Sequence, residues 1–129
     1  MGLFDIFRPK WKHSNPDVRI EAAKELSDHK TLLEMAAKDR EWFVRHEVFA
    51  LLRERDVDQE GYAYLARNST DEEIRCKAVK RLTEEAALEE VARADQYRYV
   101  RDAAEHRLEE LRQNRWGERP EAESAQKTG

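Results

Sequence analysis

Arg45, His46 and Glu47 form a reactive triplet inside the segment WFVRHEVF, residues 42–49. A histidine beside a carboxylate could act as a general base or bind a metal ion. The zinc motif HExxH, however, would need a histidine at position 50, where Ala50 stands. Successive residues of an α-helix also point in different directions. If the segment is helical, Arg45 lies at the edge of a buried stripe, and both His46 and Glu47 face solvent.

The other candidate ligands and nucleophiles do not form a set. His13, His29 and His106 occupy different positions of the repeat that the sequence contains, and Cys76 is the only thiol. No pair therefore has the spacing of a zinc site. A single cysteine excludes an internal disulfide and is typical of a reducing compartment. We expect no catalytic residue, no metal ion and no cofactor, and hence a protein that is not an enzyme.

A repeat explains the surroundings of the triplet. A Val-Arg or Ile-Arg pair occurs four times, at intervals of 26, 30 and 26 residues. Each pair is followed by Ala or Val four positions later and by Leu eight positions later, which is the spacing of a buried helical stripe. The four pairs are Val18–Arg19, Val44–Arg45, Ile74–Arg75 and Val100–Arg101.

A second block completes the repeated unit. The segment LSDHKTLLEMAAKD aligns without a gap on LTEEAALEEVARAD, so each unit reads as helix, turn and helix. Helix starts are signalled by Asn15 before Pro16 and by Thr70 three positions before Glu73. No alternating pattern of strand type competes. We predict an all-α chain with helices at about 16–27, 28–38, 41–53, 58–68, 71–82, 84–94 and 97–113.

The four copies in register resemble the HEAT-like repeat family, in the short variety with units of the form D-x-x-VR-x-x-A-x-x-L-T followed by L-x-x-x-A. The resemblance covers residues 14–112. It implies an α-solenoid of about four helical hairpins, each of which buries its apolar stripe against its neighbours. It also implies a protein-binding scaffold more than an enzyme. We expect residues 1–13 to cap this domain and residues 113–129 to be a disordered tail.

The family resemblance further implies a ladder of side chains along the stack. In such repeats an aspartate that ends one unit commonly hydrogen-bonds the arginine of the next. Asp39 lies six residues before Arg45, and Asp95 lies six residues before Arg101, so two rungs match this pattern. The third unit has Ser69 at the aspartate position, which predicts a softer junction there.

Aromatic residues are the candidate partner-binding group. Phe43 and Tyr99 precede the stripe in the second and fourth units, opposite the expected buried side, and Trp42 adjoins Phe43. Aromatic side chains often anchor protein interfaces. The alternative is that the helix starts bend and these rings fold back on the preceding turn.

Composition narrows the class of partner. Lys and Arg number 24 against 28 Asp and Glu, with both signs interleaved. This balance gives no electrostatic reason to expect nucleic acid, whose binding depends on clustered cations. We therefore predict a cytoplasmic, monomeric scaffold whose partner is another protein.

The first dozen residues leave a second interpretation open. Apolar residues there are followed by Arg8, Lys10 and Lys12, a combination that could also lie on a membrane surface. The alternatives to the scaffold are thus a membrane-surface accessory protein and an accessory subunit of an enzyme. The apolar residues are Leu3, Phe4, Ile6, Phe7 and Trp11.

Overall fold

The computed structural model describes residues 8–117, and every regular element in this range is a helix. The described residues contain no strand, so the predicted all-α class is confirmed. No helix within this range is both long and apolar enough to cross a membrane. The elements are the 3-10 helix η2 (Lys10–Lys12) and the α-helices α1 (Pro16–Glu25), α2 (His29–Lys38), α3 (Trp42–Glu54), α4 (Gln59–Asn68), α5 (Glu72–Val79), α6 (Glu85–Ala94) and α7 (Arg98–Gly117).

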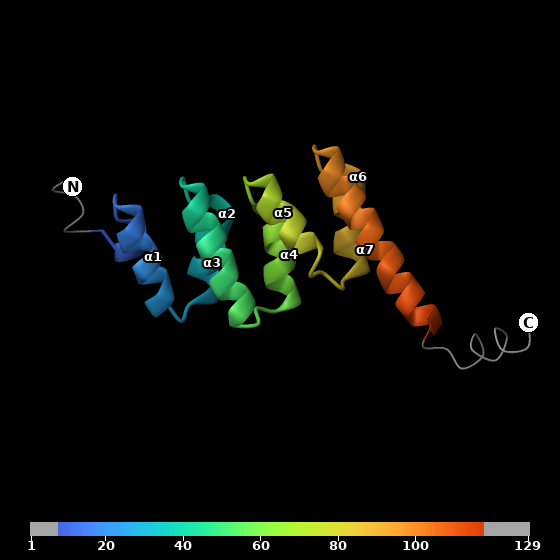
Figure 1. Cartoon of the computed structure of the whole chain (residues 1–129), viewed down its shortest axis with the longest axis horizontal. Coiled ribbons are helices and arrows are strands. Elements are labelled where there is room, and N and C mark those ends of the chain that lie inside the picture. Colours follow the sequence, from blue (N-terminus) through green and yellow to red (C-terminus); the bar gives the residue numbers. More distant parts are fainter. Residues whose placement is uncertain (1–7, 118–129) are drawn as a thin grey trace, which may run out of the picture.

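The helices are arranged in two layers along one axis, with α1 and α7 at opposite ends (Figure 1). In one layer α1 contacts α3, α3 contacts α5, and α5 contacts α7. In the other layer α2 contacts α4, and α4 contacts α6. Both layers therefore run along the same axis, and the molecule is elongated.

The most closely packed helix pairs differ from the hairpins expected from the sequence. The repeat suggested pairing the helix at 16–27 with that at 28–38, whereas the closest pairs are α2 with α3, α4 with α5, and α6 with α7. Short connections, residues 39–41, 69–71 and 95–97, join the helices of these pairs. Buried alanines such as Ala36 and Ala66 reduce the distance at which two helix axes can pack.

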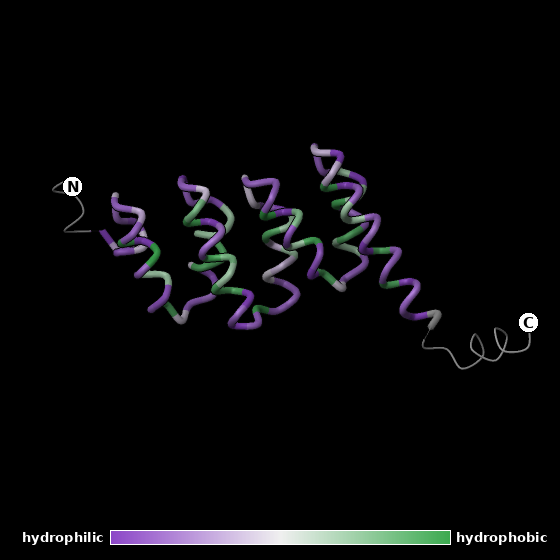
Figure 2. Tube along the Cα trace, viewed as in Figure 1, coloured by the Kyte–Doolittle hydropathy of each residue, from purple (hydrophilic) through white to green (hydrophobic). Residues whose placement is uncertain are grey.

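The predicted stripe forms the core between the layers. Its members in the second, third and fourth units are buried, and in the tube view apolar residues gather where the layers face each other (Figure 2). In the first unit Val18 and Leu26 are only half-buried, and within residues 8–117 only η2 precedes α1 at that end. The buried stripe residues are Val44, Val48, Leu52, Ile74, Ala78, Leu82, Val100, Ala104 and Leu108.

Of the two helix starts signalled in the sequence, one has the predicted cap and the other does not. The side chain of Asn15 accepts a hydrogen bond from the backbone N–H two residues later, at 2.9 Å, and Pro16 begins α1. For α5 the cap is Asp71 and not Thr70, since the Asp71 carboxylate accepts the N–H of Glu73 at 2.9 Å. A carboxylate at this position also interacts favourably with the helix dipole.

The structure describes only part of the two terminal segments that were expected from the sequence. Trp11 in η2 is half-buried against the core, and η2 contacts α1. The rest of the expected capping segment, residues 1–7, lies outside the described residues. At the other end α7 continues to Gly117, so residues 113–117 are helical and not the start of a tail. Residues 118–129 lie outside the described part of the chain.

Leu82 and Leu26 provide a matched test of the core. Leu82 is fully buried, so Leu82→Ala should lower the free energy of unfolding by about 2 to 5 kcal/mol because it leaves a cavity. Leu26 occupies the same repeat position but is half-buried, and Leu26→Ala should cost only about 1 to 2 kcal/mol. Urea unfolding followed by circular dichroism measures both. Equal losses for the two variants would contradict the register of the stripe.

Candidate functional site

Three arginines connect successive helix pairs through carboxylates. We call Arg19, Arg45 and Arg75, with their carboxylate partners, the arginine ladder. The Arg19 guanidinium donates two hydrogen bonds of 3.0 Å to Asp39, and Arg75 donates bonds of 2.8 and 3.2 Å to Asp95. Both of these pairs, Arg19–Asp39 and Arg75–Asp95, are almost completely buried. Both are also bidentate, which is the strongest geometry for a guanidinium and a carboxylate.

Asp39 and Asp95 hydrogen-bond the arginines expected from the sequence, but through the main chain, and their carboxylates bind other arginines. The expected rungs joined Asp39 to Arg45 and Asp95 to Arg101. Arg45 Nη1 instead donates to the main-chain carbonyl of Asp39 at 2.7 Å, and Arg101 Nη1 donates to that of Asp95 at 2.6 Å. The carboxylates turn toward the arginine of the preceding helix pair. The sequence spacing identified the contacting residues but not which oxygen accepts.

The second rung uses a residue that the sequence analysis did not select. Ser69 stands where Asp39 and Asp95 stand in the other connections, and Arg45 therefore reaches Asp71, two residues further on, at 2.8 Å. Ser69 is buried and its hydroxyl donates to the carbonyl of Ala37 at 3.2 Å. The prediction of a softer junction relied on a missing carboxylate, and Asp71 supplies that carboxylate.

The Asp71 carboxylate interacts with several hydrogen-bond donors. Besides Arg45, the Nε2 atom of His46 lies 3.2 Å from its Oδ2, and backbone N–H groups at the start of α5 bind its Oδ1. Burial alone would raise the pKa of the Asp71 carboxyl group, but the hydrogen bond and charge of Arg45 and the backbone donors outweigh it. The pKa of Asp71 therefore lies below its ordinary value, and the carboxylate stays charged at neutral pH.

The helical position of His46 suggested that its side chain faces solvent, but the side chain is mostly covered. Its side chain is only 17% exposed, because Asp71 lies on one side of the ring and Lys77 on the other. The Lys77 ammonium group can only donate, so Nδ1 accepts this bond, 2.9 Å long, and the imidazole proton lies on Nε2, toward Asp71. Glu47 is exposed, as expected.

A histidine paired with an aspartate also occurs in catalytic triads. Here both ring nitrogens of His46 are engaged, and the hydroxyl that lines the shallow pocket beside it, that of Thr70, donates to the carbonyl of Ala37 at 3.2 Å. No group of three or more potential ligands for a metal ion occurs among residues 8–117. The bonds of Asp71 to Arg45 and His46 join the start of α5 to α3.

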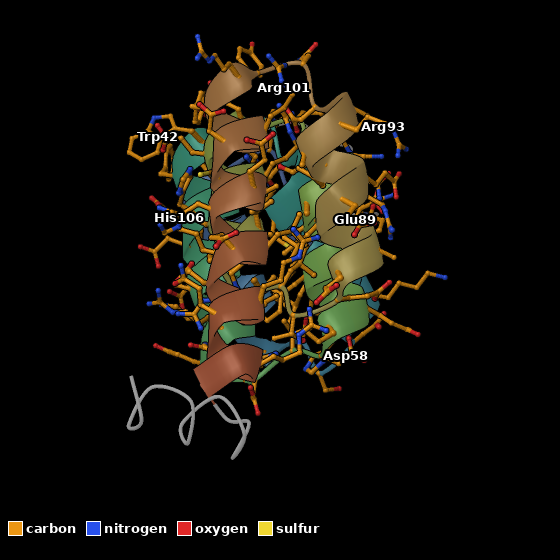
Figure 3. The ribbon with its side chains drawn as sticks, turned by 90° about the vertical axis from the view of Figure 1, so that its right-hand side faces the viewer. Trp42, Asp58, Glu89, Arg93, Arg101 and His106 are labelled. Carbon is orange, nitrogen blue, oxygen red and sulfur yellow. The ribbon has the colours of Figure 1, made fainter. Side chains whose placement is uncertain are left out.

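The candidate partner-binding aromatics separate into two kinds. Trp42 is 64% exposed and Tyr99 is 46% exposed, whereas Phe43 is half-buried against the core. Phe43, which was expected opposite the buried side, is therefore partly covered. Trp42 stands edge-on to Phe43 and His46, with ring centres 5.9 and 6.1 Å apart. Its indole projects from the side of the molecule away from α6 (Figure 3).

One exposed aromatic was missed in the sequence. Tyr97 is 42% exposed and lies 6.0 Å from Tyr99 between ring centres. Its ring also meets the guanidinium carbon of Arg75 at 5.6 Å. Tyr97 occupies the position that Asp71 has in the preceding connection, and this equivalence is the signal that could have found it.

Asp71→Asn tests the second rung. The amide keeps the shape of the side chain but removes the charge, so we expect the free energy of unfolding to fall by about 2 to 4 kcal/mol at pH 7. Because the pKa of Asp71 is lowered in the folded state, its charge stabilises the fold above the unfolded pKa. This stabilisation is lost as the pH falls through the folded pKa.

The difference between Asp71→Asn and the parent should therefore shrink below pH 4. Urea unfolding at several pH values measures it, and Asp102→Asn, at an exposed position of α7, is the control. A difference that is independent of pH would contradict a charged rung at Asp71.

Comparison with known proteins gives no match of any kind. No family model matches the chain, and no curated protein or solved structure shows significant similarity to it. A function for this protein has to be inferred from the geometry described above.

Proposed function

We propose that the chain is a non-enzymatic scaffold that binds another protein and that it is built as a short α-solenoid of HEAT-like hairpins. The two-layered row of helix pairs and the arginine ladder between them support this architecture. The single cysteine and the interleaved charges of both signs are in keeping with a monomer in the cytoplasm.

Trp42 carries the proposal. Tryptophan is the residue type most enriched at the energetic centres of protein interfaces, and here the indole is exposed on a rigid base. That base is the first turn of α3, where Arg45 and His46 are held by Asp71. A partner would meet a side chain whose backbone is already ordered, so little conformational entropy is lost on binding.

Trp42→Ala tests the proposal in the cell. The tagged chain and its Trp42→Ala variant would be purified under mild conditions, and co-purified proteins would be quantified by mass spectrometry. We expect at least one protein to be depleted about tenfold by Trp42→Ala, which corresponds to about 1.4 kcal/mol. Arg93→Ala, at an exposed position on the opposite side of the molecule, is the matched control (Figure 3).

The result has a clear negative form. If every co-purified protein is retained equally by the parent, by Trp42→Ala and by Arg93→Ala, the Trp42 surface is not a binding site for a protein.

A further inference from the structure

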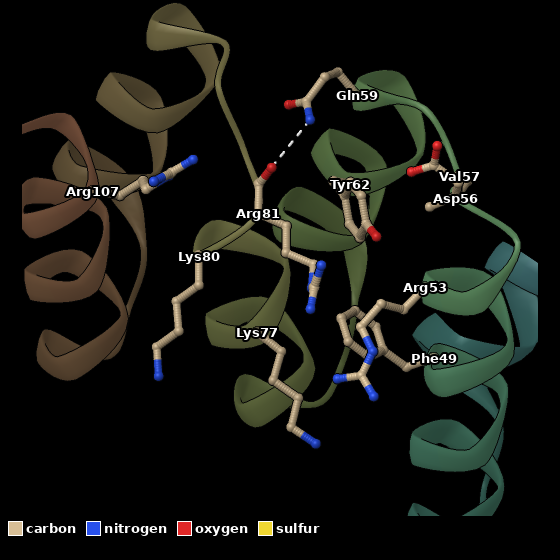
Figure 4. Close-up of a pocket in the computed structure, with 10 residues that line it drawn as sticks. All are labelled: Phe49, Arg53, Asp56, Val57, Gln59, Tyr62, Lys77, Lys80, Arg81 and Arg107. Carbon is tan, nitrogen blue, oxygen red and sulfur yellow. Dashed lines mark hydrogen bonds between the residues drawn. The ribbon is translucent and has the colours of Figure 1, made fainter. Parts of the chain in front are cut away.

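A basic groove is lined by residues of α3, α4, α5 and α7 and of the segments that follow α3 and α5 (Figure 4). Its volume is about 590 Å³, and Asp56 is the one acidic residue among those that line it. Phe49 and Tyr62 contribute to its wall, and both are almost fully buried. The cations of the basic groove are Arg53, Lys77, Lys80, Arg81 and Arg107.

None of these five cations has a carboxylate partner among the described residues. Lys77 contacts His46, and Arg107 donates to the carbonyl of Leu82 at 2.8 Å. Some exposed cations outside the groove are paired with a carboxylate, as Arg67 is with Glu90 at 2.9 Å. In a chain with more acidic than basic residues, a concave cluster of cations without carboxylates is a site of concentrated positive charge.

The position of the groove relative to the helix ends disfavours a small phosphate ligand. α3 ends at Glu54 and α5 ends at Val79, both beside the groove. One helix, α4, begins there at Gln59, but its start is already capped, since the Asp58 carboxylate accepts the N–H of Gly61 at 2.9 Å. Phosphate groups are typically bound where a helix begins, because free N–H groups point outward there. The end of a helix presents carbonyl groups and the negative pole of its dipole. The attraction for an anion must therefore come from several separate side chains.

The groove also lacks the usual features of a site for single-stranded nucleic acid. Such sites stack bases on exposed aromatic rings, but Phe49 and Tyr62 are 3% and 5% exposed. The net charge of −4 would repel a long polyanion beyond the groove itself. A short acidic peptide carries fewer negative charges than a long nucleic acid. Its backbone also has N–H donors, which a sugar-phosphate backbone lacks.

The groove is aligned with the proposed protein-binding surface. Trp42 and Arg53 are both in α3, and residues eleven positions apart lie on the same face of an α-helix, about 16 Å from each other. Phe49 lies on that face between them. An extended segment of about five residues would cover this length.

We propose that the basic groove binds an acidic segment of a partner protein, with carboxylates paired to Arg53, Arg81 and Lys77 and an apolar residue against Trp42. This inference rests on the proposed function, because it names the chemistry of the partner that the scaffold would hold. The side chains of Arg53, Arg81 and Lys77 extend into the space between α3 and α5 (Figure 4).

The test is fluorescence anisotropy with a labelled peptide of about ten residues, one leucine followed by glutamates, long enough to span the distance from Trp42 to Arg53. The double variant Arg53→Glu/Arg81→Glu changes two exposed side chains that hydrogen-bond to no other described residue. Lys30→Glu/Arg93→Glu is the control, since it changes the net charge equally at exposed positions outside the groove.

We expect the parent to bind the acidic peptide, with an affinity that falls as salt is added. The groove variant should bind at least about tenfold more weakly, whereas the control should bind within about twofold of the parent. A peptide with glutamine in place of glutamate should not bind. Trp42→Ala should weaken binding of the leucine-containing peptide and leave a peptide with glutamate in place of the leucine unaffected.

Three results would overturn the inference. These are no binding of the acidic peptide, equal binding by the groove variant and the control, and tighter groove-dependent binding of pyrophosphate or of an oligonucleotide with the same charge. The inference and the proposed function fail separately. If the acidic peptide did not bind but some co-purified proteins depended on Trp42, the proposed scaffold function would still be supported. If no co-purified protein depended on Trp42 but the acidic peptide bound to the groove, the inference about the basic groove would still be supported.

Discussion

The buried guanidinium group is the constraint on which the arrangement of the helices depends. A charged group that leaves water must recover its hydrogen bonds inside the protein. Arg45 and Arg75 do so by donating backward to a main-chain carbonyl and forward to the carboxylate of the next helix pair. Both acceptors lie in the short connections between paired helices. Each arginine therefore fixes the position of one connection relative to the next, and with it the spacing of α3, α5 and α7.

This constraint also shapes the outer surface. Because Asp71 serves both as the cap of α5 and as the acceptor of Arg45, the start of α3 and the start of α5 are held together. His46 joins the same carboxylate, and Trp42 stands against His46. The exposed indole thus lies directly above a buried ion pair. At the other end of the same helices, cations gather where α3 and α5 end, and positive charge is favourable there.

Local pattern was sufficient for the helices. The predicted bounds agree with α2, α4 and α6 to within a residue, since capping residues and a stripe with helical period act over a few neighbouring positions. The candidate site was harder to predict from the sequence than the helices were. Trp42 and Tyr99 are exposed as expected, but Phe43 is partly buried against the core. The basic groove is lined by residues of α3, α4, α5 and α7, which are far apart in the sequence and share no local pattern.

The sequence by itself determined the all-α class, the repeat and the identity of the buried stripe, because burial of apolar residues at helical spacing needs no knowledge of what lies opposite. Only the tertiary structure decided which oxygen each arginine binds. Asp39 binds the arginine that follows it, Arg45, through its main-chain carbonyl, whereas its carboxylate binds Arg19. Asp71 supplies the carboxylate that Ser69 lacks. The physical reason is that a long guanidinium side chain can reach acceptors twenty or more residues away, and the choice among them depends on how the helix pairs stack.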